Sequence, residues 1–349
     1  MFKYKGQHYR LKKPAIVVLL IVFLLVASGI TFLIHSVLSK SKLNTDDYGN
    51  INNVTTTDLP SPVHGEDYAM SNEDFIVKVF DVGQGSAMLV DYGDTEVLID
   101  GGYHNDENIH TLFESKNGLS KYVTDGTIEY IIATHSHADH IGCLPEVIEK
   151  YNVGKIIYGD LFSETAEVEY LIEAAQIKGV ELTEDSDTVI TLGKNASLTI
   201  FDVCDHDKND INANSVVTLI QYGDTYFFSD GDLPAEQETL LRGKLPRCDV
   251  VIAGHHGSAD SNSLLDELTP EYFVISCGKA AKEGTKQGNV YGYPHEEVLS
   301  QAISLNASCL GTWKSGNITF KSDGMSVTCS EDASKELTLD DAGAKKKKK

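Results

Sequence analysis

Four side chains of the types that bind metals lie within six residues, directly after an apolar stretch. Residues 128–134 (IEYIIAT) are rich in β-branched and aromatic residues, as in a buried strand, and lead into His135-Ser-His137-Ala-Asp139-His140. Because side chains alternate along an extended chain, the first two histidines point the same way, while Asp139 and His140 converge from the following turn. Imidazoles suit Zn²⁺, and the carboxylate lowers the site charge enough to allow a second metal. The sequence therefore predicts a metal centre at a strand end.

Two further apolar segments end in residues of the same types. Residues 226–229 run into Asp230-Gly-Asp232, and residues 250–253 run into Gly-His255-His256-Gly-Ser. A carboxylate at a strand end can bridge two cations, although Asp-Gly-Asp also forms ordinary turns. An α/β scaffold builds one site from distant segments by placing such residues at several strand ends.

The remaining pattern predicts a sheet protein with helices on its outer faces. Short apolar runs bounded by glycine-containing turns predict strands at 75–81, 86–92, 95–100, 128–134, 155–159, 197–203, 215–222, 225–229, 249–254, 272–278, 307–311, 317–321 and 325–329. The segments between them predict helices near 105–116, 144–151, 164–178, 234–242, 261–268 and 294–304. The six cysteines are widely spaced without a Cys-x-x-Cys pair, which is typical of buried small residues rather than a zinc ribbon.

The amino-terminal part predicts a membrane anchor. Residues 14–38 contain no Lys, Arg, Asp or Glu, and about 20 such residues cross a bilayer as a helix. Five cations precede this run and only two follow closely, so the positive-inside bias predicts a cytoplasmic segment 1–13 and an outward-facing remainder. A cleaved signal peptide is the alternative, but its apolar region is about 7–15 residues long. We therefore expect a transmembrane helix at 14–38, an extracytoplasmic linker at 39–72, a folded domain at 73–330 and a low-complexity, disordered tail at 331–349.

Charge argues against a general nucleic-acid-binding protein. The chain has 29 basic and 52 acidic residues, a net charge of −23. Between residues 43 and 330 there are 16 basic and 47 acidic residues, so the expected outer domain is strongly anionic. Affinity for nucleic acid depends largely on Lys and Arg that neutralise phosphates.

Seven motifs, taken together, resemble the metallo-β-lactamase fold and, within it, the extracellular hydrolase-like domain of the ComEC competence proteins, which take up DNA. They occur in the family's order over residues 75–312: Asp81-Val-Gly-Gln-Gly-Ser-Ala87, Leu98-Ile-Asp100-Gly-Gly102, His135 to His140, Asn214-Ser215, Gly231-Asp232, His255-His-Gly-Ser258 and Asn289-Val-Tyr-Gly-Tyr-Pro-His295. The resemblance implies an αββα four-layer sandwich with a dinuclear site at one edge, holding two divalent ions, Zn²⁺ or alternatively Mn²⁺.

The resemblance also implies roles for single residues. His135 and His137 would hold one metal, Asp139 and His140 the other, with Asp232 bridging and His255 completing the second site. Asp100 would orient the histidine loop, and Asp139 and His256 are the catalytic candidates. Around them, Asp81, Asn214, Asn289, Tyr291 and His295 are candidates for supporting the site or contacting substrate.

The sequence also departs from the family pattern. The common member of the fold has a further histidine between the first motif and the bridging aspartate, and the only candidate for it here is His206. ComEC-like domains often have Asn-Ser at this region instead, as in Asn212-Ala-Asn214-Ser215. Ser86 stands where the family usually has Asp, and Val290 where many members have Arg. The loop at 279–288 contributes three lysines, at 279, 282 and 286.

These features lead to a hypothesis of a membrane-anchored, outward-facing, metal-dependent phosphodiesterase related to a nuclease. Its partners would be the membrane, through the amino-terminal helix, and a phosphodiester that is either single-stranded DNA or a small or wall-linked compound. A cell-surface phosphorylcholine esterase is the first alternative. A non-catalytic surface binding module is the second, and β-lactam hydrolysis is a weaker third.

Overall fold

The structure is a computed structural model that describes residues 2–4, 7–9, 74–159, 161, 165–203, 210–279, 289–331 and 335–343. The chain divides into two units, residues 1–53 and 54–349. In the first unit, β1 (Phe2–Tyr4) and β2 (Gln7–Tyr9) pair antiparallel. The expected membrane helix at 14–38 and linker at 39–72 lie outside the described residues. Among the residues that are described, no helix is long and apolar enough to span a bilayer.

The second unit contains an eight-stranded sheet whose strands change from antiparallel to parallel partway across. The first five strands in spatial order pair antiparallel, and β5 to β8 pair parallel. The order is β17 (Val327–Cys329), β16 (Ile318–Ser322), β3 (Phe75–Val79), β4 (Met88–Tyr92), β5 (Thr95–Ile99), β6 (Thr127–Ala133), β7 (Asn152–Tyr158) and β8 (Glu181–Glu184).

A second sheet of seven strands has the same mixed character. Its strands β9 to β12 pair antiparallel, and β12 to β15 pair parallel. The order is β15 (Ser308–Gly311), β14 (Tyr272–Ile275), β13 (Val250–Ile252), β12 (Thr225–Ser229), β11 (Val217–Tyr222), β10 (Ala196–Phe201) and β9 (Thr188–Gly193).

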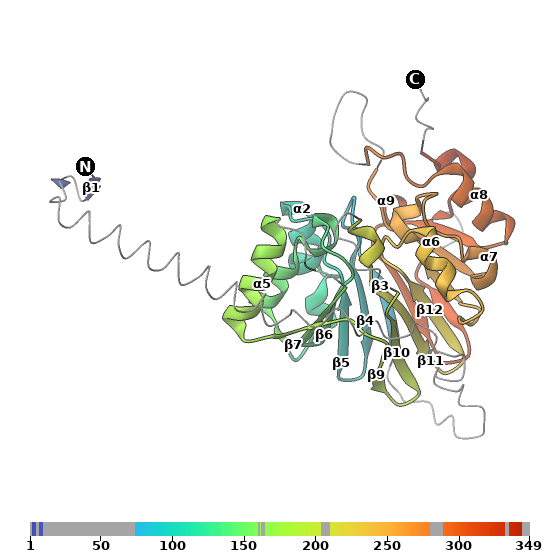
Figure 1. The fold of residues 1–349 in the computed structure, drawn as a ribbon, viewed down its shortest axis with the longest axis horizontal. Coiled ribbons are helices and arrows are strands. Elements are labelled where there is room, and N and C mark those ends of the chain that lie inside the picture. Colours follow the sequence, from blue (N-terminus) through green and yellow to red (C-terminus); the bar gives the residue numbers. More distant parts are fainter. Residues whose placement is uncertain are drawn as a thin grey trace, which may run out of the picture. The chain divides into compact units, whose positions relative to one another are not determined.

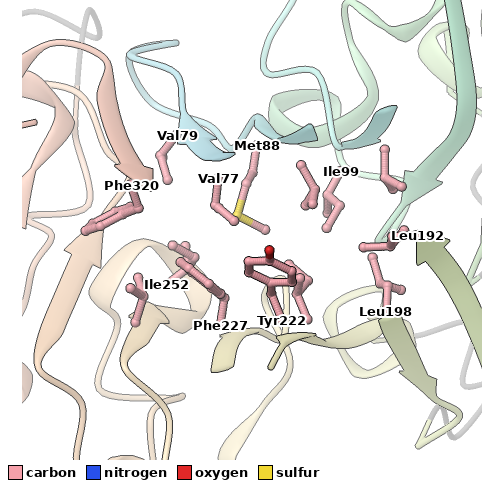
Figure 2. Packing of buried hydrophobic residues seen from close by; sticks show 14 of the residues in the cluster. Val77, Val79, Met88, Ile99, Leu192, Leu198, Tyr222, Phe227, Ile252 and Phe320 are labelled. Atoms are coloured by element: carbon pink, nitrogen blue, oxygen red, sulfur yellow. The ribbon is translucent and has the colours of Figure 1, made fainter. Parts of the chain in front are cut away.

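The two sheets pack face to face around a central apolar core. Val77, Val79, Met88 and Ile99 project from the eight-stranded sheet, and side chains of the seven-stranded sheet such as Leu198 meet them (Figure 2). Alternate residues of the same strands point outward into two further cores beneath helices. Burial on both faces explains why the central strands of each sheet are apolar almost throughout.

Helices cover the outer face of each sheet, which completes four layers (Figure 1). The eight-stranded sheet carries α2 (Asp106–Ile109), η2 (His110–Glu114), η3 (Leu119–Lys121), α3 (Ala138–Ile141), α4 (Leu144–Lys150) and α5 (Ala166–Lys178). The seven-stranded sheet carries α6 (Ala235–Glu238), η5 (Thr239–Leu241), α7 (Leu265–Leu268) and α8 (Glu296–Ser304). Four short turns, η4 (Asn212–Asn214), η6 (Gly254–Gly257), α9 (Thr312–Ser315) and η8 (Leu339–Asp341), complete the helical elements of the described residues. The predicted α/β, αββα sandwich is confirmed.

The carboxyl-terminal segment differs from the expected disordered tail at 331–349. Residues 335–343 pack on the domain: Leu337 is buried in the core under the seven-stranded sheet, and its N–H donates to the carbonyl of Cys309. Lys314 and Asp341 form an ion pair of 3.0 Å. The prediction of disorder is wrong for this stretch, because Leu337 and Ala342 pack under the seven-stranded sheet and backbone hydrogen bonds join the segment to the domain.

Candidate metal centre

Strands of both sheets deliver the predicted ligand residues to one edge. β5 and β6 end just before Asp100 and His135, and β12 and β13 end just before Asp232 and His255. Because these strands are parallel within each sheet, their carboxyl ends lie at the same edge. The sandwich brings the two edges together, so residues that are about 100 positions apart in sequence come into contact.

Asp100 fixes the orientation of the first histidine loop. Its backbone has a left-handed φ of 59°, which is unusual for a residue with a side chain and turns the carboxylate back over the strand end. Oδ2 lies 2.7 Å from Nδ1 of His140 and accepts the Thr134 hydroxyl at 2.8 Å, while Oδ1 accepts the Thr134 N–H at 2.9 Å. A proton held on Nδ1 by this carboxylate leaves Nε2 of His140 free to bind a metal.

Asp232 lies at the centre of four imidazoles. Its carboxylate oxygens are 3.2 Å from Nε2 of His140, 3.6 Å from Nε2 of His255, and 3.8 Å from Nε2 of both His135 and His256. The backbone N–H of Asp232 donates to the Ser215 hydroxyl, which is also 3.3 Å from Nδ1 of His135. A single carboxylate thus lies among imidazoles from two sheets, and its role as a bridging ligand stays a prediction.

Ligand-type atoms form two neighbouring groups. One consists of His135, His137 and Asp232, and the other of Asp139, His140 and His256, with the ligand atoms of each group within 4.8 Å of one another. The pairing of His135 with His137 and of Asp139 with His140 follows the sequence expectation. The carboxyl end of β13 supplies the second group with His256, where the sequence suggested His255.

The backbone explains why His256 enters the second group. His255 and His256 both have left-handed conformations, with φ of 47° and 56°, so the chain turns sharply between them. Nδ1 of His256 donates to the carbonyl of Ser276 at 2.8 Å, and Nε2 is 3.3 Å from Oδ2 of Asp139. His255 instead places Nε2 3.2 Å from the hydroxyl of Tyr293. A metal role for His255 remains a prediction.

Three buried atoms test whether the site fits a metal. Nε2 of His140, Nε2 of His256 and Oδ1 of Asp232 are buried without a hydrogen-bond partner among the described residues. The Asp232 oxygen is 3.2 Å from the first nitrogen and 3.8 Å from the second. Buried polar atoms are otherwise almost always paired, because an unpaired one costs about 1–3 kcal/mol. Nitrogen and oxygen donors this close together fit a divalent cation.

The charges around these atoms favour metal binding. Burial lowers the pKa of the His135 imidazole well below its ordinary value, so the ring is neutral and has a lone pair to offer. Burial alone would raise the pKa of Asp232, but His140 and His256 outweigh it and hold that pKa well below its ordinary value. Burial alone would lower the pKa of His140, but Asp232 and Asp100 outweigh it and raise that pKa, so a metal bound at Nε2 would displace a proton. The site therefore contains an ionised carboxylate beside a neutral imidazole.

The glycine-rich segment after β3 supports the histidine loop from outside. The N–H of Ser86 donates to the carbonyl of Asp139 at 3.0 Å. A Cβ on Gly85 would lie 2.5 Å from that same carbonyl oxygen, so only glycine permits the approach. Asp81 stays within its own turn, where Oδ1 accepts the Gly83 N–H at 3.4 Å.

The other predicted residues form supporting structure around the centre. Asn214 is buried and donates to the carbonyl of Asp210. Asn289 is buried and hydrogen-bonds to the backbone of Tyr293. His295 accepts the Ala259 N–H at 2.9 Å through Nδ1, while Tyr291 is exposed. His206 lies outside the described residues.

Three site residues were missed by sequence reasoning. Thr134 contacts Asp100, His135 and His140; Ser215 contacts His135 and Asp232; and Tyr293 contacts His255. Each adjoins or lies within a motif that the sequence does show. A single hydroxyl carries no pattern of its own, so only the folded geometry identifies its role.

Residues 80–266, just over half of the chain, match the Metallo-beta-lactamase superfamily. The chain belongs to this family, whose members include metal-dependent hydrolases, and the predicted membership is confirmed.

The chain is similar to proteins of bacterial competence. It is 26% identical over 261 residues to ComE operon protein 3 of Bacillus subtilis, covering 70% of this chain and 33% of that protein. It is 25% identical over 260 residues to competence protein ComA of Neisseria gonorrhoeae, covering 72% of this chain and 33% of that protein. The chain thus spans about a third of the length of these relatives. Among solved structures, the metallo-beta-lactamase fold protein YhfI of Bacillus subtilis matches with 15% identity and a TM-score of 0.46, covering 71% of this chain and all of that one.

Proposed function

We propose that this protein is a metal-dependent phosphodiesterase that binds two divalent ions, Zn²⁺ or alternatively Mn²⁺. The observation that carries the proposal is the close approach of three buried atoms that make no hydrogen bond of good geometry, Nε2 of His140, Nε2 of His256 and Oδ1 of Asp232. The ions would be held by the groups His135, His137, Asp232 and Asp139, His140, His256. When bound, such ions make hydroxide available near neutral pH and stabilise charge on phosphoryl oxygens.

The chain's own residues hold and orient the site. Asp100 keeps Nδ1 of His140 protonated, and the Ser276 carbonyl does the same for Nδ1 of His256, so that both Nε2 atoms face the centre. Asp139, like His137, is partly exposed, and its carboxylate is therefore accessible to a substrate and to water. Asp139 and His256 remain the candidates for handling protons during hydrolysis.

The likeness to competence proteins supports a DNA-like phosphodiester as substrate. A small or wall-linked phosphodiester is the second candidate, because the net charge of −23 weakens the binding of a long polyanion. Of the three lysines in the 279–288 loop, only Lys279 is described, and it is exposed. Absence of hydrolysis would favour a third candidate, a non-catalytic binding module.

We also propose that the protein acts at the outer face of the cell membrane. The uncharged run 14–38, which follows five cations, would anchor it, and the domain would face outward. Proteinase accessibility in spheroplasts, with an epitope at each end of the chain, tests this topology. A carboxyl-terminal epitope that resists protease in intact spheroplasts contradicts it.

A hydrolysis panel tests the proposed function. Purified full chain is loaded with zinc or manganese and given bis-p-nitrophenyl phosphate, p-nitrophenyl phosphorylcholine, single-stranded DNA and a chromogenic β-lactam. We expect metal-dependent cleavage of the phosphodiesters and none of the β-lactam, and we expect His137→Ala to abolish cleavage while leaving the fold intact. Full activity of His137→Ala, or cleavage of the β-lactam alone, contradicts the proposal.

A further inference from the structure

Hydrogen bonds close the loop from Asn289 to Tyr293 next to the candidate metal centre. The Asn289 side chain is buried, and its Oδ1 accepts the N–H groups of Gly292 and Tyr293 at 3.0 and 3.2 Å. Its Nδ2 donates to the carbonyl of Tyr293 at 2.5 Å, and its own N–H donates to the carbonyl of Lys279. One buried amide thus closes a tight loop and fixes the direction of the side chains on it.

Tyr293 connects this loop to the metal centre. Its hydroxyl is 3.2 Å from Nε2 of His255, which is in turn 3.6 Å from the carboxylate of Asp232. Its ring meets His255 edge to face, with centroids 5.5 Å apart. Tyr293 is therefore separated from Asp232 by His255 alone, and an aromatic surface begins at its ring.

Tyr291 continues that surface outward. Its ring is stacked on Tyr293 with centroids 5.5 Å apart and planes within 17°. The side chain is nevertheless 54% exposed, so one face packs on Tyr293 while much of the ring is open to solvent. An aromatic residue this exposed gains little from burial, whereas an open ring face that is joined through Tyr293 to the candidate metal centre is suited to binding a planar group.

We propose that Tyr291 is a specificity-determining residue that stacks on a planar base of the substrate, next to the phosphodiester. This inference rests on the proposed function. The near-parallel rings of Tyr291 and Tyr293 present a flat face, which another flat ring can extend. A choline group is instead best held by several rings converging around the cation, as in aromatic cages. Stacking is also independent of charge, so it provides affinity on an anionic protein.

The test separates base binding from phosphate binding. Two fluorescein-labelled hexamers with phosphorothioate linkages are compared by anisotropy with the zinc-loaded full chain, one bearing thymine on every sugar and the other abasic at every position. Stacking of one base contributes about 1–3 kcal/mol, so we expect the thymine hexamer to bind about 5- to 150-fold more tightly. Tyr291→Leu should remove this preference, and Tyr291→Phe, which keeps the ring, should retain it.

Equal binding of both hexamers by the wild type, or no binding of either, overturns the inference. A preference that survives in Tyr291→Leu also overturns it, as does displacement of the probe by phosphorylcholine but not by thymidine monophosphate. Hydrolysis of bis-p-nitrophenyl phosphate is measured separately on the same preparation. If the base preference is absent and hydrolysis is intact, the inference fails and the proposed phosphodiesterase stands. If the base preference is present and hydrolysis is absent, the proposed phosphodiesterase fails while base binding by Tyr291 stands.

Discussion

Oδ2 of Asp100 lies 2.7 Å from Nδ1 of His140, and both side chains are buried. The same carboxylate accepts two hydrogen bonds from Thr134, so one group connects the ends of β5 and β6 to a candidate metal ligand. Removal of this carboxylate would break three hydrogen bonds at once, two to Thr134 and one to His140. The relationship makes Asp100 the residue through which the fold orients the first histidine loop.

We therefore expect Asp100→Asn to weaken metal binding more than it weakens the fold. An amide offers one acceptor oxygen where the carboxylate offers two, and it carries no charge to hold the proton on His140. Outer partners of this kind contribute about 10- to 100-fold to metal affinity. Zinc competition with a chromogenic chelator measures the change, with exposed Asp94→Asn as the matched control. Equal zinc affinity in the two variants contradicts the assigned role.

Substitution of Gly142, two residues after His140, should have a steric effect on the histidine turn. A Cβ there would lie 2.5 Å from the backbone nitrogen of His104 and 2.9 Å from the carbonyl oxygen of Gly102. Gly142→Ala must therefore displace either that segment or the histidine turn, at a cost of about 1–3 kcal/mol. We expect both the unfolding free energy in urea and the zinc affinity to fall.

Gly179→Ala is the control for that variant. Gly179 ends α5 with a φ of 71° and nothing close to its missing Cβ. Its substitution should cost about 1 kcal/mol through backbone conformation alone. The role of Gly142 in the close packing of the histidine turn is contradicted if zinc affinity also falls in Gly179→Ala. It is likewise contradicted if zinc affinity does not fall in Gly142→Ala.

Glu96 on β5 predicts how stability depends on pH. Burial raises its pKa, and the neighbouring carboxylates of Glu129 and Asp91 raise it further, to about 8. The folded state thus keeps a proton that the unfolded chain releases above its ordinary pKa of 4.5. Stability from this group is fully present below about pH 4.5 and is lost as the pH rises to about 8.

We expect Glu96→Gln to remove most of this loss. Thermal unfolding followed by circular dichroism from about pH 4.5 to 9 should show Glu96→Gln more stable than wild type at the alkaline end, because the amide needs no proton. Exposed Glu149→Gln should follow the wild-type curve. Parallel curves for Glu96→Gln and wild type would show that the carboxyl ionises at no cost.

Leu337 predicts that the carboxyl-terminal segment stabilises the domain. The side chain is buried in the core under the seven-stranded sheet. Leu→Ala at a buried site costs about 2–5 kcal/mol. Leu339→Ala, two residues on and largely exposed, should cost little. Urea unfolding compares the two, and equal stability would mean that the segment is not docked in solution.

The sequence predicts most of the sandwich because each core strand is apolar on both faces. The meander at 75–100 and the strand before His135 appear where the pattern places them. β8 and β9 escape prediction because they are edge elements with exposed polar residues, such as Glu181 and Thr188. Tertiary pairing, rather than local composition, makes them strands.

The candidate site is predictable as a set of motifs but not as a geometry. Spacing indicates that residues 135–140, Asp232 and the 255–256 pair meet, because parallel strands end at one edge. It does not show which of His255 and His256 faces Asp139. Two successive left-handed residues decide that, and no pattern of side-chain types encodes them in advance.

Metal content of the purified full chain tests the central claim most directly. After incubation with excess zinc and removal of free metal, inductively coupled plasma mass spectrometry should find about two equivalents per chain, and fewer in Asp232→Asn, which lacks the shared carboxylate. A wild-type chain that is folded by circular dichroism and retains no zinc or manganese would contradict the account.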